Sequence, residues 1–321
     1  MESVFEWTGF GLGLLFGSFL NVCISRLPEH ESIVHPHSRC PKCGHAVRWY
    51  DNVPVVSWLF LRTRCRDCGQ RISWRYPAVE LAVGLWFAFL VDRVFAVGNA
   101  SEWTNLHPPA AHIYGDLIGT AGLAILGFLL IGLMVMDWRT MRLPDAFTLT
   151  GIGIGFALTC VRAFLLKPGE GDIVLNTTRQ LRLSSPGSFA AQGNVFMTGA
   201  EAMVLGRVAA ICGAALVLLA VRWAYKAVRK RDGMGLGDVK LMAMIAAFLG
   251  FWPAMLALFA GVVAASGYGI VLVARGKASG DSKLPLGSFI AAGGLFAAVF
   301  AQHLVEWYLG LLLGQRLVRA R

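Results

Sequence analysis

Apolar residues fill long stretches of this chain, and short polar or basic segments separate most of them. Runs of roughly 20 apolar residues are typical of helices that cross a membrane. Eight such stretches occur, at about 5–25, 78–97, 117–136, 146–166, 202–222, 239–251, 253–274 and 286–313. The sixth is short and meets the seventh at residues 252–253. The pattern predicts an all-α polytopic membrane protein with about eight transmembrane helices.

Composition supports this prediction, because 56% of the 321 residues are hydrophobic and only 15% are charged. The mean hydropathy is +0.60. A soluble domain of this length would need far more polar surface. The first apolar stretch follows a carboxylate and lacks a small-residue cleavage site, so we interpret it as a retained helix and not as a signal peptide.

The net charge of +10 raises the alternative of nucleic-acid binding. The distribution of the basic residues argues against this alternative, because 20 of the 29 lie in the segments 26–77, 137–145, 222–240 and 275–285. This bias fits the rule that cytoplasmic loops are positively charged, with the N-terminus outside. We therefore expect a lipid bilayer and no nucleic acid as partner.

Two C-x-x-C pairs lie in segment 27–77, the one long polar insertion between the first two apolar stretches. They are Cys40 with Cys43 and Cys65 with Cys68. This spacing is typical of a four-thiolate zinc site, in which a fully coordinated ion is structural. The alternatives are two disulfides or free thiols, and a reducing cytoplasm disfavours disulfides.

Two aspartates sit at the ends of apolar stretches, where an ionisable group is costly and usually functional. Asp137 ends the third stretch, and Asp238 precedes the sixth within the sequence Gly-Leu-Gly-Asp. The expected topology brings both to the same cytoplasmic edge. Two neighbouring carboxylates favour one shared proton, which suits hydrolysis of a peptide bond by an acid and a base.

Other roles are also compatible with these acids. Asp238 could simply cap a helix, and a metal could lie between the two carboxylates, although no histidine joins them. Asp145 also lies near Asp137, but its position after Pro144 predicts a helix N-cap. The negative end of a helix dipole at Asp137 predicts that this residue holds the shared proton.

These motifs together resemble the type IV prepilin peptidase family of bacterial inner membranes, bifunctional leader peptidases and N-methyltransferases. The resemblance covers most of the chain. It rests on GSFLNV at 17–22, RLP at 26–28, both cysteine pairs, NVP at 52–54, SW at 57–58, ISWRYP at 72–77, Glu80, the segment 137–145 and GLGDVKL at 235–241.

The resemblance implies that Asp137 and Asp238 are catalytic and cut the short basic leader of pilin-like or pseudopilin precursors at the cytoplasmic membrane face. It also implies N-methylation of the new N-terminus with S-adenosylmethionine. We expect a first transmembrane helix at 1–26, a cytoplasmic zinc domain at 27–77 and a membrane-embedded peptidase domain at 78–321.

Two departures from the family pattern stand out: segment 167–200 is long, and Ser288 replaces a frequent proline. Two other functions are compatible with the same residues. One is a different aspartyl intramembrane protease with the same Gly-x-Gly-Asp motif. The other is a non-enzymatic transporter or assembly factor, stabilised by zinc, in which the aspartates relay protons.

Overall fold

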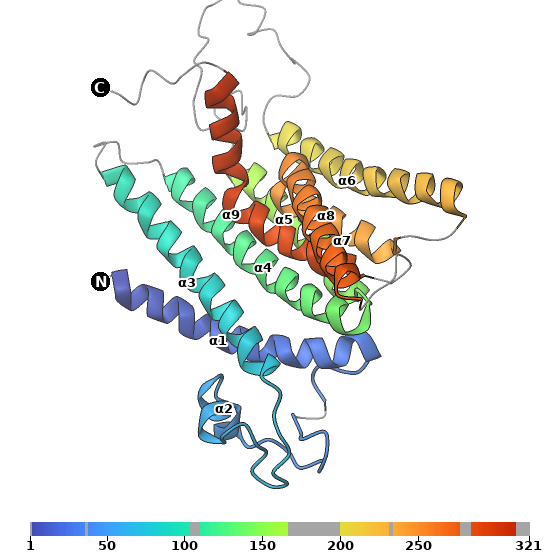
Figure 1. Ribbon diagram of the computed structural model, residues 1–321. Helices are drawn as coiled ribbons and strands as arrows, with labels where there is room; N and C mark the ends of the chain where they lie inside the picture. Colours follow the sequence, from blue (N-terminus) through green and yellow to red (C-terminus); the bar gives the residue numbers. More distant parts are fainter. Residues whose placement is uncertain are drawn as a thin grey trace, which may run out of the picture.

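The computed structural model describes residues 2–35, 38–102, 110–165, 200–230, 234–276 and 284–312, and these form an all-helical protein. Two short 3₁₀ turns, at Leu27–Glu29 and Trp49–Asn52, accompany the helices. The helices, labelled in Figure 1, are α1 (Glu2–Arg26), α2 (Val56–Phe60), α3 (Arg75–Glu102), α4 (Ala110–Thr140), α5 (Asp145–Leu165), α6 (Ala200–Arg229), α7 (Leu236–Leu249), α8 (Phe251–Ala274) and α9 (Leu286–Leu312). Nearly all of segment 167–200 lies outside the described residues.

Each of the eight predicted apolar stretches is a helix, but the prediction of eight spans is not supported. Within the described residues, five helices are long and apolar enough to cross a membrane: α1, α4, α5, α6 and α8. The 14 residues of α7 extend only ~21 Å, short of a hydrocarbon core of ~30 Å. Charged residues interrupt α3, and the apolar part of α9 found within the described residues is short.

Helices α1 and α3 pack closely because glycine removes side chains from their interface. A Cβ atom added to Gly13 would lie 2.7 Å from the Cα atom of Gly84, and one added to Gly17 would lie 2.6 Å from the Cα atom of Glu80. Small residues allow such close approach between membrane helices. The start of α3 is therefore fixed beside the second half of α1.

Helix α7 lies at the centre of the remaining bundle and packs against α4, α5, α6, α8 and α9. Most of its residues are buried, including Leu241, Met242, Met244 and Ile245, which have no exposed surface. A helix that is apolar on all sides is typical of such a central position. Its burial fixes the first turn of α7 against the last turn of α4, where the two predicted aspartates lie.

The cysteine-bearing segment projects from one end of the bundle, beside the end of α1 and the start of α3 (Figure 1). It contains α2 and two isolated antiparallel bridges, Arg39 to Ala46 and Arg64 to Arg71, but no longer strand among its described residues. With so little secondary structure, the segment needs another source of stability.

Candidate active site and cysteine cluster

The two predicted aspartates come from different helices and are both buried. Asp137 lies in the last turn of α4 and exposes 5% of its surface, while Asp238 lies in the first turn of α7 and exposes 8%. Burying a carboxylate is costly unless it is hydrogen-bonded or shares a proton. The contacts around each aspartate therefore decide what the pair can do.

Gly287, at the start of α9, lies against both carboxyl groups. A Cβ atom added there would lie 3.0 Å from Oδ1 of Asp238 and 3.1 Å from Cγ of Asp137. Because one point is this close to both atoms, they are at most about 6 Å apart. Only a residue without a side chain fits against these carboxyl groups in their present positions.

Ser288 is the hydrogen-bond donor to Asp137. Its backbone N–H donates to Oδ2 of Asp137 at 2.6 Å, and its hydroxyl oxygen lies 2.9 Å from the same atom. The hydroxyl oxygen is also 2.9 Å from the carbonyl oxygen of Met134, so its single proton serves one acceptor at a time. Both donors stabilise an ionised Asp137.

Asp238 has a weaker set of partners. Its Oδ2 atom accepts the backbone N–H of Gly235 at 3.2 Å. Gly235 is the N-cap residue of α7, and Asp238 is the third helical residue. The alternative in which Asp238 is itself the N-cap is therefore wrong, although its bond to Gly235 does help to begin the helix.

The prediction that Asp145 caps α5 is also wrong. Asp145 is the first helical residue of α5, and its Oδ1 atom accepts from Nζ of Lys240 at 2.6 Å. Both side chains are partly exposed, so this ion pair contributes little stability. Lys240 lies two residues after Asp238 in α7 and 95 residues after Asp145, so sequence spacing alone does not identify this partner.

The four predicted zinc ligands converge. The Sγ atoms of Cys40, Cys43, Cys65 and Cys68 all lie within 4.8 Å of one another. Tetrahedral zinc with Zn–S bonds of about 2.3 Å separates its thiolates by roughly 3.8 Å, and the Cys40 and Cys68 sulfurs are 3.8 Å apart. The cysteine cluster therefore fits a tetrahedral metal ion.

Two similar turns present these sulfurs. The backbone N–H of Cys40 donates to the carbonyl of His45, and that of Cys65 donates to the carbonyl of Gln70. Each turn closes on a glycine with positive φ, Gly44 at 73° and Gly69 at 67°. The backbone N–H groups of Cys43 and Lys42 lower the pKa of the Cys40 thiol to about 6, whereas desolvation and the neighbouring thiols raise the pKa of Cys43 to about 12, so Cys40 ionises before Cys43.

Comparisons with known proteins identify the family to which the chain is similar. The family described as Bacterial Peptidase A24 N-terminal domain matches residues 12–94, and the Type IV leader peptidase family matches residues 182–270. A prepilin leader peptidase/N-methyltransferase of Burkholderia pseudomallei is 30% identical over 90% of this chain and 83% of its own. The chain belongs to the prepilin leader peptidase/N-methyltransferase family.

Other relatives carry the same name. That of Myxococcus xanthus is 36% identical over 84% of this chain but only 64% of its own length, and that of Aeromonas salmonicida is 29% identical over 96% of both chains. No solved structure is significantly similar to the chain. The protein is thus a multi-pass membrane protein of a bacterial peptidase family, and the two matched segments include the cysteine cluster and Asp238 but not Asp137.

In this prepilin peptidase family member, a buried carboxylate attaches the cysteine-bearing segment to the helices. Glu80 of α3 accepts the backbone N–H of Val55 at 2.7 Å and lies 3.4 Å from the side-chain amide of Asn21 on α1. Val55 has a φ of 59°, which is unfavourable for a β-branched residue. The hydrogen bond to Glu80 offsets part of the cost of this backbone conformation.

Two residues of the site were missed by sequence reasoning. The sequence marks Ser288 only as a departure from the family pattern, and it does not single out Gly287. Their positions follow from the packing of α9 against α4 and α7, which no local pattern reports. A small residue next to a hydroxyl at the start of an apolar helix is too common to identify such a role.

Proposed function

We propose that the chain is a membrane aspartyl endopeptidase that removes the short basic leader of pilin-like precursors at the cytoplasmic membrane face. Asp137 and Asp238 are the catalytic residues of this proposal. One observation carries it: the two buried carboxyl groups both lie against Gly287, from helices that are far apart in sequence. Such a pair is suited to share one proton and to activate a water molecule.

We infer that Asp137 is the base and Asp238 the proton donor. The helix dipoles favour the opposite assignment, because Asp137 ends a helix and Asp238 begins one. Each dipole contributes only about 0.3–1 kcal/mol, however. Hydrogen bonds to an ionised group contribute about 1.5–3 kcal/mol each. Asp137 has the shorter bonds, from Ser288, so the hydrogen bonds decide in favour of its ionised form.

The proposed hydrolysis follows from this assignment. The Asp137 carboxylate removes a proton from water as the water oxygen bonds to the carbonyl carbon of the substrate. Asp238 gives its proton to the carbonyl oxygen. The tetrahedral intermediate then breaks its C–N bond: the proton held by Asp137 passes to the leaving nitrogen, and one hydroxyl of the intermediate returns a proton to Asp238 as the carbonyl re-forms. Burial of both aspartates strengthens these proton transfers by excluding bulk water.

The cysteine cluster has a structural role in this proposal. Cys40, Cys43, Cys65 and Cys68 would hold zinc, which supplies fold stability when all four positions are protein thiolates. The proposal also includes N-methylation of the new N-terminus with S-adenosylmethionine as methyl donor, on the basis of the relatives' names. The sequence contains no glycine-rich nucleotide loop, and we derive no step for this second reaction.

The direct test uses full-length protein purified and reconstituted in liposomes with a pilin-like precursor. Mass spectrometry of the product should report one new N-terminus and loss of the basic leader. Asp137→Asn and Asp238→Asn proteins serve as matched controls and should leave the precursor intact. Intact precursor with the unmodified protein, combined with proton flux that both substitutions abolish, would instead support the proton-relay alternative.

A further inference from the structure

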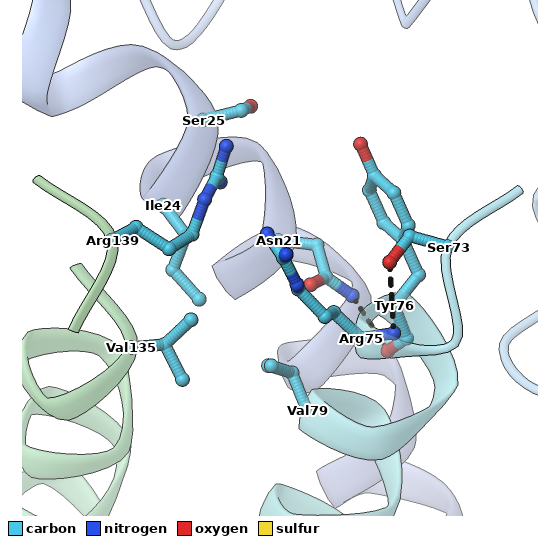
Figure 2. Close-up of a pocket in the computed structure, with 9 residues that line it drawn as sticks. All are labelled: Asn21, Ile24, Ser25, Ser73, Arg75, Tyr76, Val79, Val135 and Arg139. Atoms are coloured by element: carbon cyan, nitrogen blue, oxygen red, sulfur yellow. Dashed lines mark hydrogen bonds between the residues drawn. The ribbon is translucent and has the colours of Figure 1, made fainter. Parts of the chain in front are cut away.

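A pocket of about 110 Å³ lies where α1, α3 and α4 meet, on the side of the bundle that carries the cysteine-bearing segment. Arg75 from the start of α3 and Arg139 from the last turn of α4 both line it. Figure 2 shows their side chains extending from different helices towards the space between the three elements. We call this the arginine pocket.

Positive charge in the arginine pocket is not neutralised by the described part of the chain. Neither Arg75 nor Arg139 forms an ion pair there, and no lining residue is acidic. The nearby Glu80 carboxylate is already engaged by the Val55 backbone and Asn21. Both arginines are exposed to solvent, which weakens the repulsion between their guanidinium groups, and an anion between them removes what remains.

The backbone also favours an anion in the arginine pocket. Helix α3 begins at Arg75, so the positive end of its dipole faces the arginine pocket. The hydroxyl group of Ser73 also lines it and can donate a hydrogen bond, whereas the hydroxyl of Ser25 already donates to the carbonyl of Val22. Guanidinium groups, hydroxyls and a helix N-terminus are the groups that bind oxyanions such as phosphate.

The rest of the wall is apolar and lies at the membrane edge. Ile24, Val79 and Val135 form it. The two candidate spans that contribute to the pocket, Val4–Glu29 and Leu117–Thr140, both end close to it. A free phosphate ion gains nothing from an apolar wall, whereas a lipid headgroup is followed by apolar chains. Basic pockets between helix ends at the cytoplasmic surface are typical sites for anionic lipids.

We propose that the arginine pocket binds the phosphate group of an anionic phospholipid headgroup. The bound lipid bridges the start of α3 and the end of α4, two residues beyond Asp137. This site is separate from the aspartates and does not depend on the proposed peptidase activity.

The test measures lipid retention by native mass spectrometry of full-length protein released from micelles that contain phosphatidylcholine and phosphatidylglycerol. Unmodified protein should retain phosphatidylglycerol selectively. Arg75→Gln and Arg139→Gln should each weaken retention about 5-fold, and the double variant more. Arg142→Gln is the matched control, because it removes the same charge from the same loop region without lining the pocket. Thermal melting of each variant checks that the fold is kept.

Competition with inorganic phosphate separates the two sources of the oxyanion. Phosphatidylglycerol should remain bound when inorganic phosphate is added in excess. Displacement of the lipid by inorganic phosphate, with equal affinity for both, would overturn the lipid assignment. Equal retention by the double variant and by Arg142→Gln would overturn the site itself.

Discussion

Ser288 donates its backbone N–H to Oδ2 of Asp137 across 2.6 Å, although 151 residues separate the two positions. This bond joins the start of α9 to the end of α4 and leaves the neighbouring Gly287 against both aspartates. It is the contact that most directly distinguishes Asp137 from Asp238, since Asp238 accepts only a longer bond from Gly235 among the described residues.

Replacing either aspartate by asparagine should abolish cleavage while the protein still folds. Asparagine has the shape of aspartate but cannot give or accept a proton, so Asp137→Asn and Asp238→Asn should each lose at least about 100-fold in cleavage rate. Asp145→Asn is the matched control and should keep most of the activity, because its partly exposed ion pair with Lys240 contributes little. Cleavage is compared at equal membrane levels; an inactive, folded Asp145→Asn protein would contradict the assignment.

Removing the Ser288 hydroxyl should slow cleavage by about three- to ten-fold. Ser288→Ala keeps the backbone N–H bond to Asp137 but loses the second donor. Ser288→Thr keeps the hydroxyl and should retain more activity than the alanine variant. Cleavage rates at saturating precursor test this prediction, since a purely structural role for the hydroxyl would instead lower protein levels and melting temperature. Equal rates for all three proteins would show that the hydroxyl does not act on Asp137.

Adding a methyl group at position 287 should separate the aspartates. In Gly287→Ala the new Cβ atom would lie about 3 Å from atoms of both carboxyl groups, so one or both must move. A displacement of this size should reduce the cleavage rate by about 10- to 100-fold. Gly153→Ala on α5 is the control, because a Cβ atom there meets nothing within 4 Å. Unchanged activity in Gly287→Ala would mean that the carboxyl groups need not stay together.

Purified protein should contain about one zinc ion per chain, bound by the four cysteines. Cys65→Ser should lose the metal and become more sensitive to proteolysis between residues 27 and 74, because the segment has little other structure. Cys212→Ser removes an exposed cysteine outside the cluster and should keep its zinc. Metal analysis of freshly purified protein decides the matter, and four free thiols without metal would refute the zinc site.

Methyl transfer should survive loss of the proteolytic aspartates. Hydrolysis needs the carboxylate pair, whereas methylation needs a deprotonated amine positioned beside a methyl donor. Asp238→Asn protein should therefore methylate a pilin peptide that has already been cut, with S-adenosylmethionine supplied. The measurement is the mass of the peptide N-terminus. Loss of methylation while S-adenosylmethionine still binds would mean that the aspartates serve both reactions.

The sequence by itself determined the features that depend on local chemistry. Long apolar runs must be helical in a membrane, because their backbone groups find no other partners there. Two C-x-x-C pairs form tight turns whose sulfurs can meet around one ion, as the cysteine cluster confirms. The sequence also shows that Asp137 and Asp238 lie at the ends of apolar runs. An ionisable residue at that depth usually has a function, so both could be identified as candidate site residues.

Only the tertiary structure decided how these parts meet. Hydropathy does not distinguish the buried helix α7 from a membrane span, because both are apolar on every side. The position of Gly287 against both carboxyl groups, the bond from Ser288 and the ion pair between Asp145 and Lys240 all join helices that are distant in the chain. Such contacts depend on which helix faces pack together, and a single sequence records the composition of those faces but not their partners.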